Sequence, residues 1–145
     1  MRIDGYAYGG DVAKWLSSYL EKENLDLICF GDDMEARKCK DIDEKSNMAH
    51  ENDLTIYEDY SPYMLISQAS LDDLNKRLAR PVTMSSFRPN FTITDCEAYA
   101  EDSWTRFSIG NNDSGDGARF YKIKDCVRCL LTTVDPNSGT RNADQ

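Results

Sequence analysis

Basic side chains and long apolar runs are both scarce in this sequence. Lys and Arg number 17 against 26 Asp and Glu, which gives a formal net charge of -9. Affinity for a phosphate backbone comes mainly from clustered Lys and Arg, and no basic stripe is present, so a nucleic-acid partner is excluded. No stretch reaches the roughly 18 apolar residues of a membrane span, and the N-terminus lacks the features of a signal peptide. We therefore expect no membrane contact from this segment.

Histidine is also rare, and cysteine is present in an odd number. The chain has one His and five Cys, with no secretory signal. Free thiols in odd number are typical of a reducing compartment, whereas disulfide frameworks belong to secreted proteins. The cytosol or an equivalent intracellular space is the expected location.

The composition is that of a packed globular protein. At 145 residues, with 40% hydrophobic and 30% charged side chains, the chain is long enough to bury a core. We expect one domain that covers residues 1–145.

The first 53 residues predict a helix, a strand and a charged loop. Asp11 is the expected N-cap of an amphipathic helix, and the apolar residues behind it recur at helical spacing: Val12, Trp15, Leu16, Tyr19 and Leu20. The alternation at 25–30 predicts a strand, so that helix and strand would form a crossover. Residues 32–53 carry charges of both signs without a sustained period, which indicates a solvated loop or lid.

A second helix is expected in the middle of the chain. Ser70 and Asp73 form a start that resembles a capping box, and Leu71, Leu74 and Leu78 follow at helical spacing. Pro81 should stop this helix at Arg80.

The second half of the chain is rich in predicted strands. Short β-prone runs occupy 91–94, 105–109, 120–123 and 130–134, each bounded by turn residues, and 111–117 reads as a hairpin connection. Together with two helices, these strands predict an α+β domain built on a β-barrel or a strongly bent sheet with flanking helices. Residues 140–145 are expected to form a disordered tail.

The sharpest local motif is the pair Cys126 and Cys129, which precedes the β-branched run at 132–134. A structural zinc site needs four ligands, but the other cysteines are scattered and His50 is the only histidine. A redox dithiol normally lies at a helix N-terminus, whereas this pair enters a segment that favours strand. A third reading, in which both thiols are merely small packed side chains, stays open on the motif alone.

Two further segments carry polar groups next to expected strands. Arg88 and Asn90 flank Pro89, and a guanidinium offers a planar fork of donors that suits phosphate or paired carbonyl groups. Asp59 and Ser61 supply a carboxylate and a hydroxyl before the apolar run at 63–66. Ordinary turn roles explain each segment equally well when it is taken singly.

Taken together, these motifs resemble the MOSC family, and within it the mitochondrial amidoxime-reducing branch. The resemblance rests on Ile66 to Asn75, Phe87-Arg88-Pro89-Asn90, Tyr99 to Trp104, Ile109-Gly110, and Cys126 through Pro136. It extends from about Gly10 to Gly139, with the charged loop and the 111–117 insertion as departures. It also implies a MOSC domain that is incomplete at both ends within residues 1–145, because members of the family carry a further N-terminal barrel, a membrane anchor and later strands.

The resemblance implies roles for particular residues. Cys129 would be the protein ligand to molybdenum, since a soft thiolate suits such a metal, and it would be the catalytic residue. Arg88 and Arg128 would hold the pterin and its phosphate, with Asn90, Asp59 and Ser61 as polar neighbours. Cys126 is expected to be structural or to support the ligand residues.

An activity is implied as well: a molybdenum-dependent reductase of small N-hydroxylated substrates, fed with electrons by a b-type cytochrome and its NADH-dependent reductase. The location implied is the mitochondrial outer membrane. Because the flanking parts carry cofactor contacts, we expect the isolated segment to be folded but inactive.

Two alternatives come from other functional classes. One is a cofactor sulfurase or sulfur carrier of the MOSC type, which would need pyridoxal phosphate in a fused domain. The other is a truncated binding module without catalysis.

Overall fold

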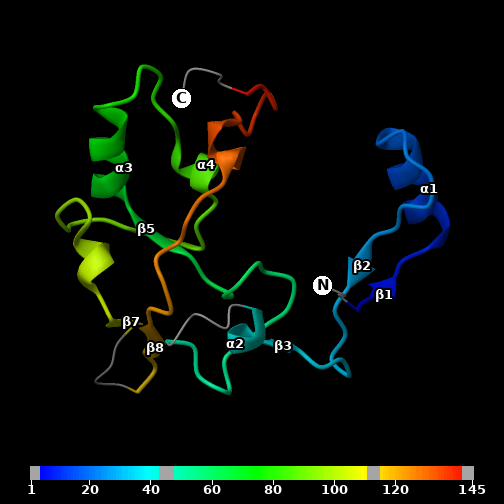
Figure 1. Cartoon of the computed structure of the whole chain (residues 1–145), viewed down its shortest axis with the longest axis horizontal. Helices are drawn as coiled ribbons and strands as arrows, with labels where there is room; N and C mark the ends of the chain where they lie inside the picture. Colours follow the sequence, from blue (N-terminus) through cyan, green and yellow to red (C-terminus); the bar gives the residue numbers. More distant parts are fainter. Residues whose placement is uncertain (1–3, 43–47, 111–114, 142–145) are drawn as a thin grey trace.

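A computed structural model describes residues 4–42, 48–110 and 115–141, and over these residues the chain combines short helices with small sheets (Figure 1). The helices are α1 (Gly10–Tyr19), α2 (Cys39–Ile42), α3 (Gln68–Asn75) and α4 (Met84–Phe87), with the 3-10 helices η1 (Ala100–Ser103) and η2 (Leu130–Thr133). The strands are β1 (Tyr6–Ala7), β2 (Ile28–Cys29), β3 (Arg37–Lys38), β4 (Leu54–Thr55), β5 (Leu65–Ser67), β6 (Phe91–Ile93), β7 (Arg106–Ile109) and β8 (Ala118–Tyr121). The predicted α+β class is confirmed.

The expected barrel or strongly bent sheet does not form among the described residues. The strands pair two by two, as β1–β2, β3–β4, β5–β6 and β7–β8, and only β5–β6 is parallel. Each described strand is two to four residues long and has a partner on one edge alone, so the pairs do not join into a closed sheet. None of the described helices is long and apolar enough to cross a membrane.

The first unit consists of β1, α1 and β2, and it stands apart from the other elements in Figure 1. The predicted helix is confirmed, but it begins at Gly10 with Gly9 as N-cap, and Asp11 lies in its first turn. The predicted crossover is wrong because β1 and β2 are antiparallel. No residue of α1 is buried, and Trp15 and Tyr19 stack on its surface with ring centroids 5.3 Å apart.

Tyr57 links this unit to the remainder of the chain. Its hydroxyl donates a hydrogen bond to the carbonyl oxygen of Asp4 over 3.3 Å, and its ring meets Phe30 edge to face at 6.3 Å between centroids.

The charged segment 32–53 contains β3 and α2, and residues 43–47 within it lie outside the described residues. β3 pairs with β4 just beyond it. Arg37 strengthens the pairing, because Nε donates to the carbonyl of Ile56 and Nη2 to that of Glu58, both over 2.7 Å. Cys39 is fully buried beneath this ladder.

The central unit runs from β5 into α3. β5 lies parallel to β6, which falls within the predicted strand at 91–94. Ser67, and not Ser70, caps the helix: its hydroxyl accepts the Ser70 N–H over 3.0 Å. The helix ends at Asn75, before the predicted stop, and the Asn75 side chain closes the following loop by two hydrogen bonds to the Val82 backbone.

Glu101 anchors this unit to η1. Oε1 accepts from the Ser67 N–H over 3.0 Å and from the Ser70 hydroxyl over 2.6 Å. The same hydroxyl accepts the Tyr99 N–H over 2.7 Å. Desolvation raises the pKa of Glu101, but these hydrogen bonds outweigh it, so the pKa lies below the ordinary value of 4.5.

The predicted strand at 130–134 is wrong. Leu130–Thr133 form η2, because the Cys129 carbonyl accepts the Thr132 N–H and hydroxyl and the Thr133 hydroxyl bonds the Leu130 carbonyl. The described start of the predicted tail, Thr140 and Arg141, is bonded to the 134–135 backbone, and residues 142–145 lie outside the described part.

The cap at Ser67 predicts a local stability effect. Ser67→Ala removes the acceptor for the Ser70 N–H in a fully buried setting. We expect a loss of about 1 kcal/mol in the free energy of unfolding. Urea denaturation followed by circular dichroism measures it. Ser18→Ala, on the exposed face of α1, is the control; an equal loss there would remove the special role of the cap.

The depressed pKa of Glu101 predicts how stability depends on pH. A carboxylate with a lowered folded pKa contributes stability above its unfolded pKa, and this stability is lost as the pH falls through the folded pKa. Glu101→Gln should therefore destabilise the chain at pH 7 and flatten the decline of stability below about pH 5. Unfolding curves at several pH values measure both effects. Identical slopes for variant and parent chain would contradict the assignment.

Candidate functional site

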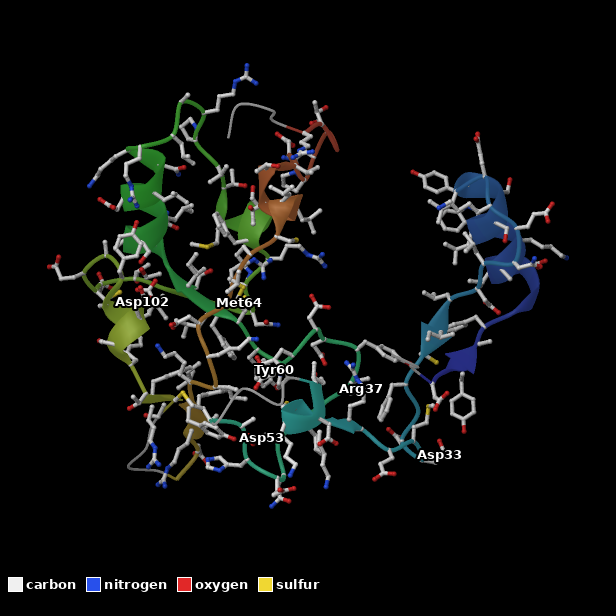
Figure 2. The ribbon with its side chains drawn as sticks, viewed as in Figure 1. Asp33, Arg37, Asp53, Tyr60, Met64 and Asp102 are labelled. Carbon is white, nitrogen blue, oxygen red and sulfur yellow. The ribbon has the colours of Figure 1, made fainter. Side chains whose placement is uncertain are left out.

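A cavity of about 1000 Å³ opens between several segments of the chain, four of which supply most of its lining. Its walls come from the segment 58–65, the turn at 88–91, η1, and the stretch from Arg119 to Arg128. Figure 2 shows Tyr60 and Met64 on the chain that runs through the centre of the molecule, with Asp102 on η1 beyond them. All three residues line the cavity.

Arg128 ties these walls together. Nη2 donates to the carbonyl oxygen of Phe87 over 2.8 Å, and Nη1 lies 3.4 Å from Met64 Sδ and 3.4 Å from Cys126 Sγ. Every acceptor in this set is uncharged. The guanidinium therefore forms no ion pair with the described residues.

Arg88 lines the same cavity from the turn at 88–91. It ends α4 in the left-handed conformation, with φ 53°, immediately before Pro89. A non-glycine residue pays of order 1 kcal/mol for this backbone, and such strain gathers at functional sites. The Arg88 guanidinium has no hydrogen bond or ion pair with the residues that the structure describes.

The three predicted polar neighbours also line the cavity. Asn90 is partly occupied, because Oδ1 accepts the Met64 N–H over 2.9 Å, which leaves its amide nitrogen for a ligand. The Ser61 hydroxyl donates weakly to the Tyr63 carbonyl over 3.4 Å. Asp59 is exposed at the rim. The structure thus brings together Arg88, Arg128, Asn90, Asp59 and Ser61.

The two cysteines of the motif differ in their position relative to the cavity. Cys126 lines the cavity, whereas Cys129, three residues later, is exposed and precedes η2 as its N-cap. Cys39 differs from both, since burial, together with nearby Asp53, raises the pKa of its thiol. Cys39 is therefore an unreactive packed thiol, whereas Cys126 and Cys129 are accessible to a reagent or a metal.

Sequence reasoning missed the other basic groups of the site. Arg119, Lys122 and Lys124 line the cavity beside Arg88 and Arg128. The Lys124 ammonium lies 4.2 Å from the ring centroid of Tyr60. The alternation of Lys122 and Lys124 just before the cysteine motif is a signal that could have revealed them, because alternate residues of an extended chain face one side.

Two buried polar atoms on the cavity wall lack partners among the described residues: Tyr60 Oη and Glu101 Oε2. A buried polar group without a hydrogen bond costs about 1–3 kcal/mol. Such atoms next to a cavity are suited to polar groups of a bound molecule.

No cluster of three His, Cys, Asp or Glu side chains in the described ranges has a geometry that could hold a metal ion. A metal centre built from these residues would thus take at most two protein donors of these types, with the other donors supplied by a ligand.

Comparisons with known proteins identify the family to which this chain belongs. The family model for the MOSC domain matches residues 52–145. The chain is 39% identical over 139 residues to mitochondrial amidoxime-reducing component 1 of Mus musculus, which covers 96% of this chain and 38% of the relative. Component 1 of Homo sapiens is 37% identical, and the match covers 96% of this chain and 39% of the relative. Component 2 of Homo sapiens is 34% identical, and the match covers 99% of this chain and 40% of the relative. This chain spans about two fifths of the length of these relatives, and it belongs to the MOSC domain family.

Proposed function

We propose that this chain holds a molybdenum cofactor, Mo-molybdopterin, for the reduction of N-hydroxylated compounds such as amidoximes. One observation carries the proposal: the Phe87–Asn90 turn and the Cys126–Arg128 segment, far apart in sequence, meet on one cavity through the guanidinium of Arg128. The relatives named above, which are called amidoxime-reducing components, support the class of substrate.

The described residues fit such a cofactor. The cavity, about 1000 Å³, has the size of a pocket for a cofactor-sized molecule. Arg88 has a guanidinium without a partner among the described residues, and Arg128 spends its donors on neutral acceptors, so both charges are left for a phosphate. The partnerless hydroxyl of Tyr60 and the amide nitrogen of Asn90 add groups for hydrogen bonds to a pterin.

Cys129 is the residue that we propose as molybdenum ligand. Its exposed thiol follows Arg128 directly, and a thiolate is the soft donor that such a metal takes beside sulfur donors of the pterin. Cys129 does not itself line the cavity, but it follows the wall residue Arg128 directly, and from there its thiolate would hold the metal. Cys126 then supports the site through its contact with Arg128.

The overall reaction takes up two electrons and two protons, breaks the N–O bond and releases water. When bound, the molybdenum cofactor supplies the two-electron chemistry. The protein residues bind and orient: the arginines hold the anionic end, and the exposed rim admits a small substrate. We propose a b-type cytochrome with its NADH-dependent reductase as electron donors, and the mitochondrial outer membrane as location. The name of the relatives supports the mitochondrial part of this proposal.

The ligand assignment is tested in a chimera in which this chain replaces the matching segment of the mouse relative. Cys129→Ala should abolish amidoxime reduction and change the electron paramagnetic resonance signal of molybdenum. Cys126→Ala is the matched control and should keep that signal, because its thiol only contacts Arg128. Equal loss in both variants would refute the assignment.

The same chimera separates the other functional classes. A sulfur carrier would show a persulfide on Cys129 by mass spectrometry and no amidoxime reduction. A binding module would retain molybdenum and pterin without turnover.

The two arginines predict a common defect in cofactor retention. Arg88→Gln and Arg128→Gln each remove a charge-assisted hydrogen bond worth about 1.5–3 kcal/mol, so cofactor affinity should fall about tenfold or more. Molybdenum per protein, measured by mass spectrometry after dialysis, reports the loss. Lys22→Gln, an exposed cation beyond α1, should retain the metal as the unmodified chimera does. Full retention in Arg88→Gln would show that this residue serves only the turn.

A further inference from the structure

The hairpin of β7 and β8 has one aromatic and one polar face. Phe107 and Phe120 stack on one face, with ring centroids 5.0 Å apart and planes within 9°. Arg106 lies opposite Tyr121, and Arg119 precedes Tyr121 by two residues. Side chains two residues apart on a strand share a face, so Arg106, Arg119 and Tyr121 lie together on the polar face.

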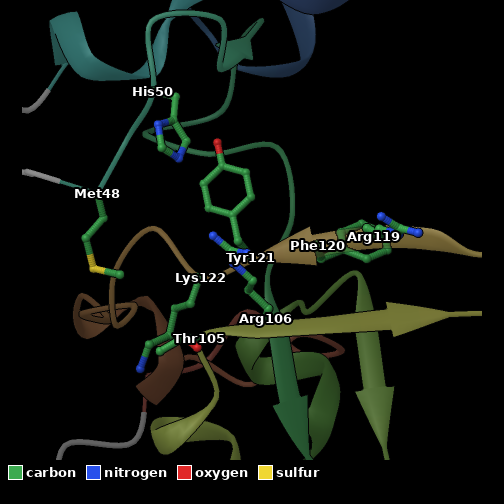
Figure 3. Close-up of a pocket in the computed structure, with 8 residues that line it drawn as sticks. All are labelled: Met48, His50, Thr105, Arg106, Arg119, Phe120, Tyr121 and Lys122. Carbon is green, nitrogen blue, oxygen red and sulfur yellow. The ribbon is translucent and has the colours of Figure 1, made fainter.

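A hollow of about 780 Å³ lies over the end of this hairpin. His50 forms its far side, with its ring edge to face against Tyr121 at 5.1 Å between centroids. Figure 3 shows Arg106 beside Tyr121, whose ring points to His50, and Arg119 farther along β8. The hollow therefore combines two guanidinium groups with two flat rings.

Its charge is unbalanced. Arg106 and Arg119 have no hydrogen bond or ion pair with the described residues, and none of the described residues that line the hollow is acidic. Lys122 is occupied, since its ammonium pairs with Asp125 over 2.8 Å and also bonds the Asp102 carbonyl. In a chain of net charge -9, two arginines on one face that pair with none of the described residues mark a place where an anion is favoured.

We propose that this hollow is a binding site for a small phosphate-bearing molecule, held by Arg106 and Arg119 and bordered by Tyr121 and His50. Guanidinium groups bind phosphate oxygens in pairs, and long side chains at diagonal positions of a hairpin can reach one ligand. A hollow of this volume has the size of a small-molecule pocket, whereas the flat surface of a protein partner would not fill it. Tyr121 brings no negative charge to the hollow, because burial and the hydrogen bond that its hydroxyl donates to Asp53 raise its pKa to about 12.

This site is distinct from the cavity of the proposed function, although the two share the stretch Arg119–Lys122 as a wall. Arg106 lines only the hollow, and Arg88 and Arg128 line only the larger cavity. The inference therefore does not rest on the molybdenum cofactor, and these residues separate the two sites experimentally.

The test uses inorganic pyrophosphate and the single histidine of the 145-residue chain. His50 gives one set of ring proton signals in NMR, and they border the proposed site. Titration with pyrophosphate at fixed pH should move these signals along a saturable curve, and added salt should weaken the binding. Arg106→Gln and Arg119→Gln should each weaken it about tenfold, while Arg106→Lys should keep part of it because the charge remains.

Two control variants decide whether the anion binds in the hollow or elsewhere. Lys22→Gln and Arg88→Gln should leave the titration unchanged. Loss of binding in Arg88→Gln, with none in Arg106→Gln, would place the anion in the larger cavity and overturn the proposal. So would a linear, unsaturable response of the His50 signals in the unmodified chain.

Discussion

The Arg128 guanidinium is the contact on which the shape of the candidate site depends. It reaches the Phe87 carbonyl and the sulfurs of Met64 and Cys126, and so joins the 126–128 stretch to the two segments that lead into the paired strands β5 and β6. Its acceptors carry no formal charge, so the same group that assembles the walls leaves a cation facing the interior. Structure and ligand attraction thus come from one side chain, and Lys could not replace it, because a single ammonium lacks the planar fork.

Elsewhere, hydrogen bonds from side chains to backbone do the work that long strands do in other domains. Asn90 caps Met64 at the start of β5, Asn75 closes the loop to Val82, and Arg37 extends the β3–β4 ladder. The bonds of Asn90 and Arg37 satisfy backbone groups next to short strands, and those of Asn75 satisfy the Val82 backbone within a loop. These polar side chains hold the cavity walls in place with little buried apolar area.

The sequence predicted the elements whose pattern is local. The apolar spacing of α1 and the β-prone runs at β6 and β7 were sufficient to predict those elements. The N-cap of α3 could not be predicted from the sequence, because Ser67 and Ser70 both suit that role and the parallel pairing of β5 decides between them. The β-branched run after Cys129 formed η2 because the Thr132 and Thr133 hydroxyls bond the preceding turn and the described strands offer no partner. Arg88, Arg128 and Cys129 were expected on one cavity from the family resemblance. The two arginines line it, but Cys126 lies on its wall and Cys129 does not, because the rotation of this irregular segment is encoded by no periodicity.

The contacts of Arg128 span 64 residues to Met64 and 41 to Phe87. Closing such long loops costs entropy before any contact is gained, so these bonds form after the local turns and the cap of α3. By the same reasoning they are the first to be lost in a local opening, since exposed hydrogen bonds between distant segments lie at the low end of the range of opening free energies. The cavity can then open and admit a large ligand while β5 and α3 stay folded.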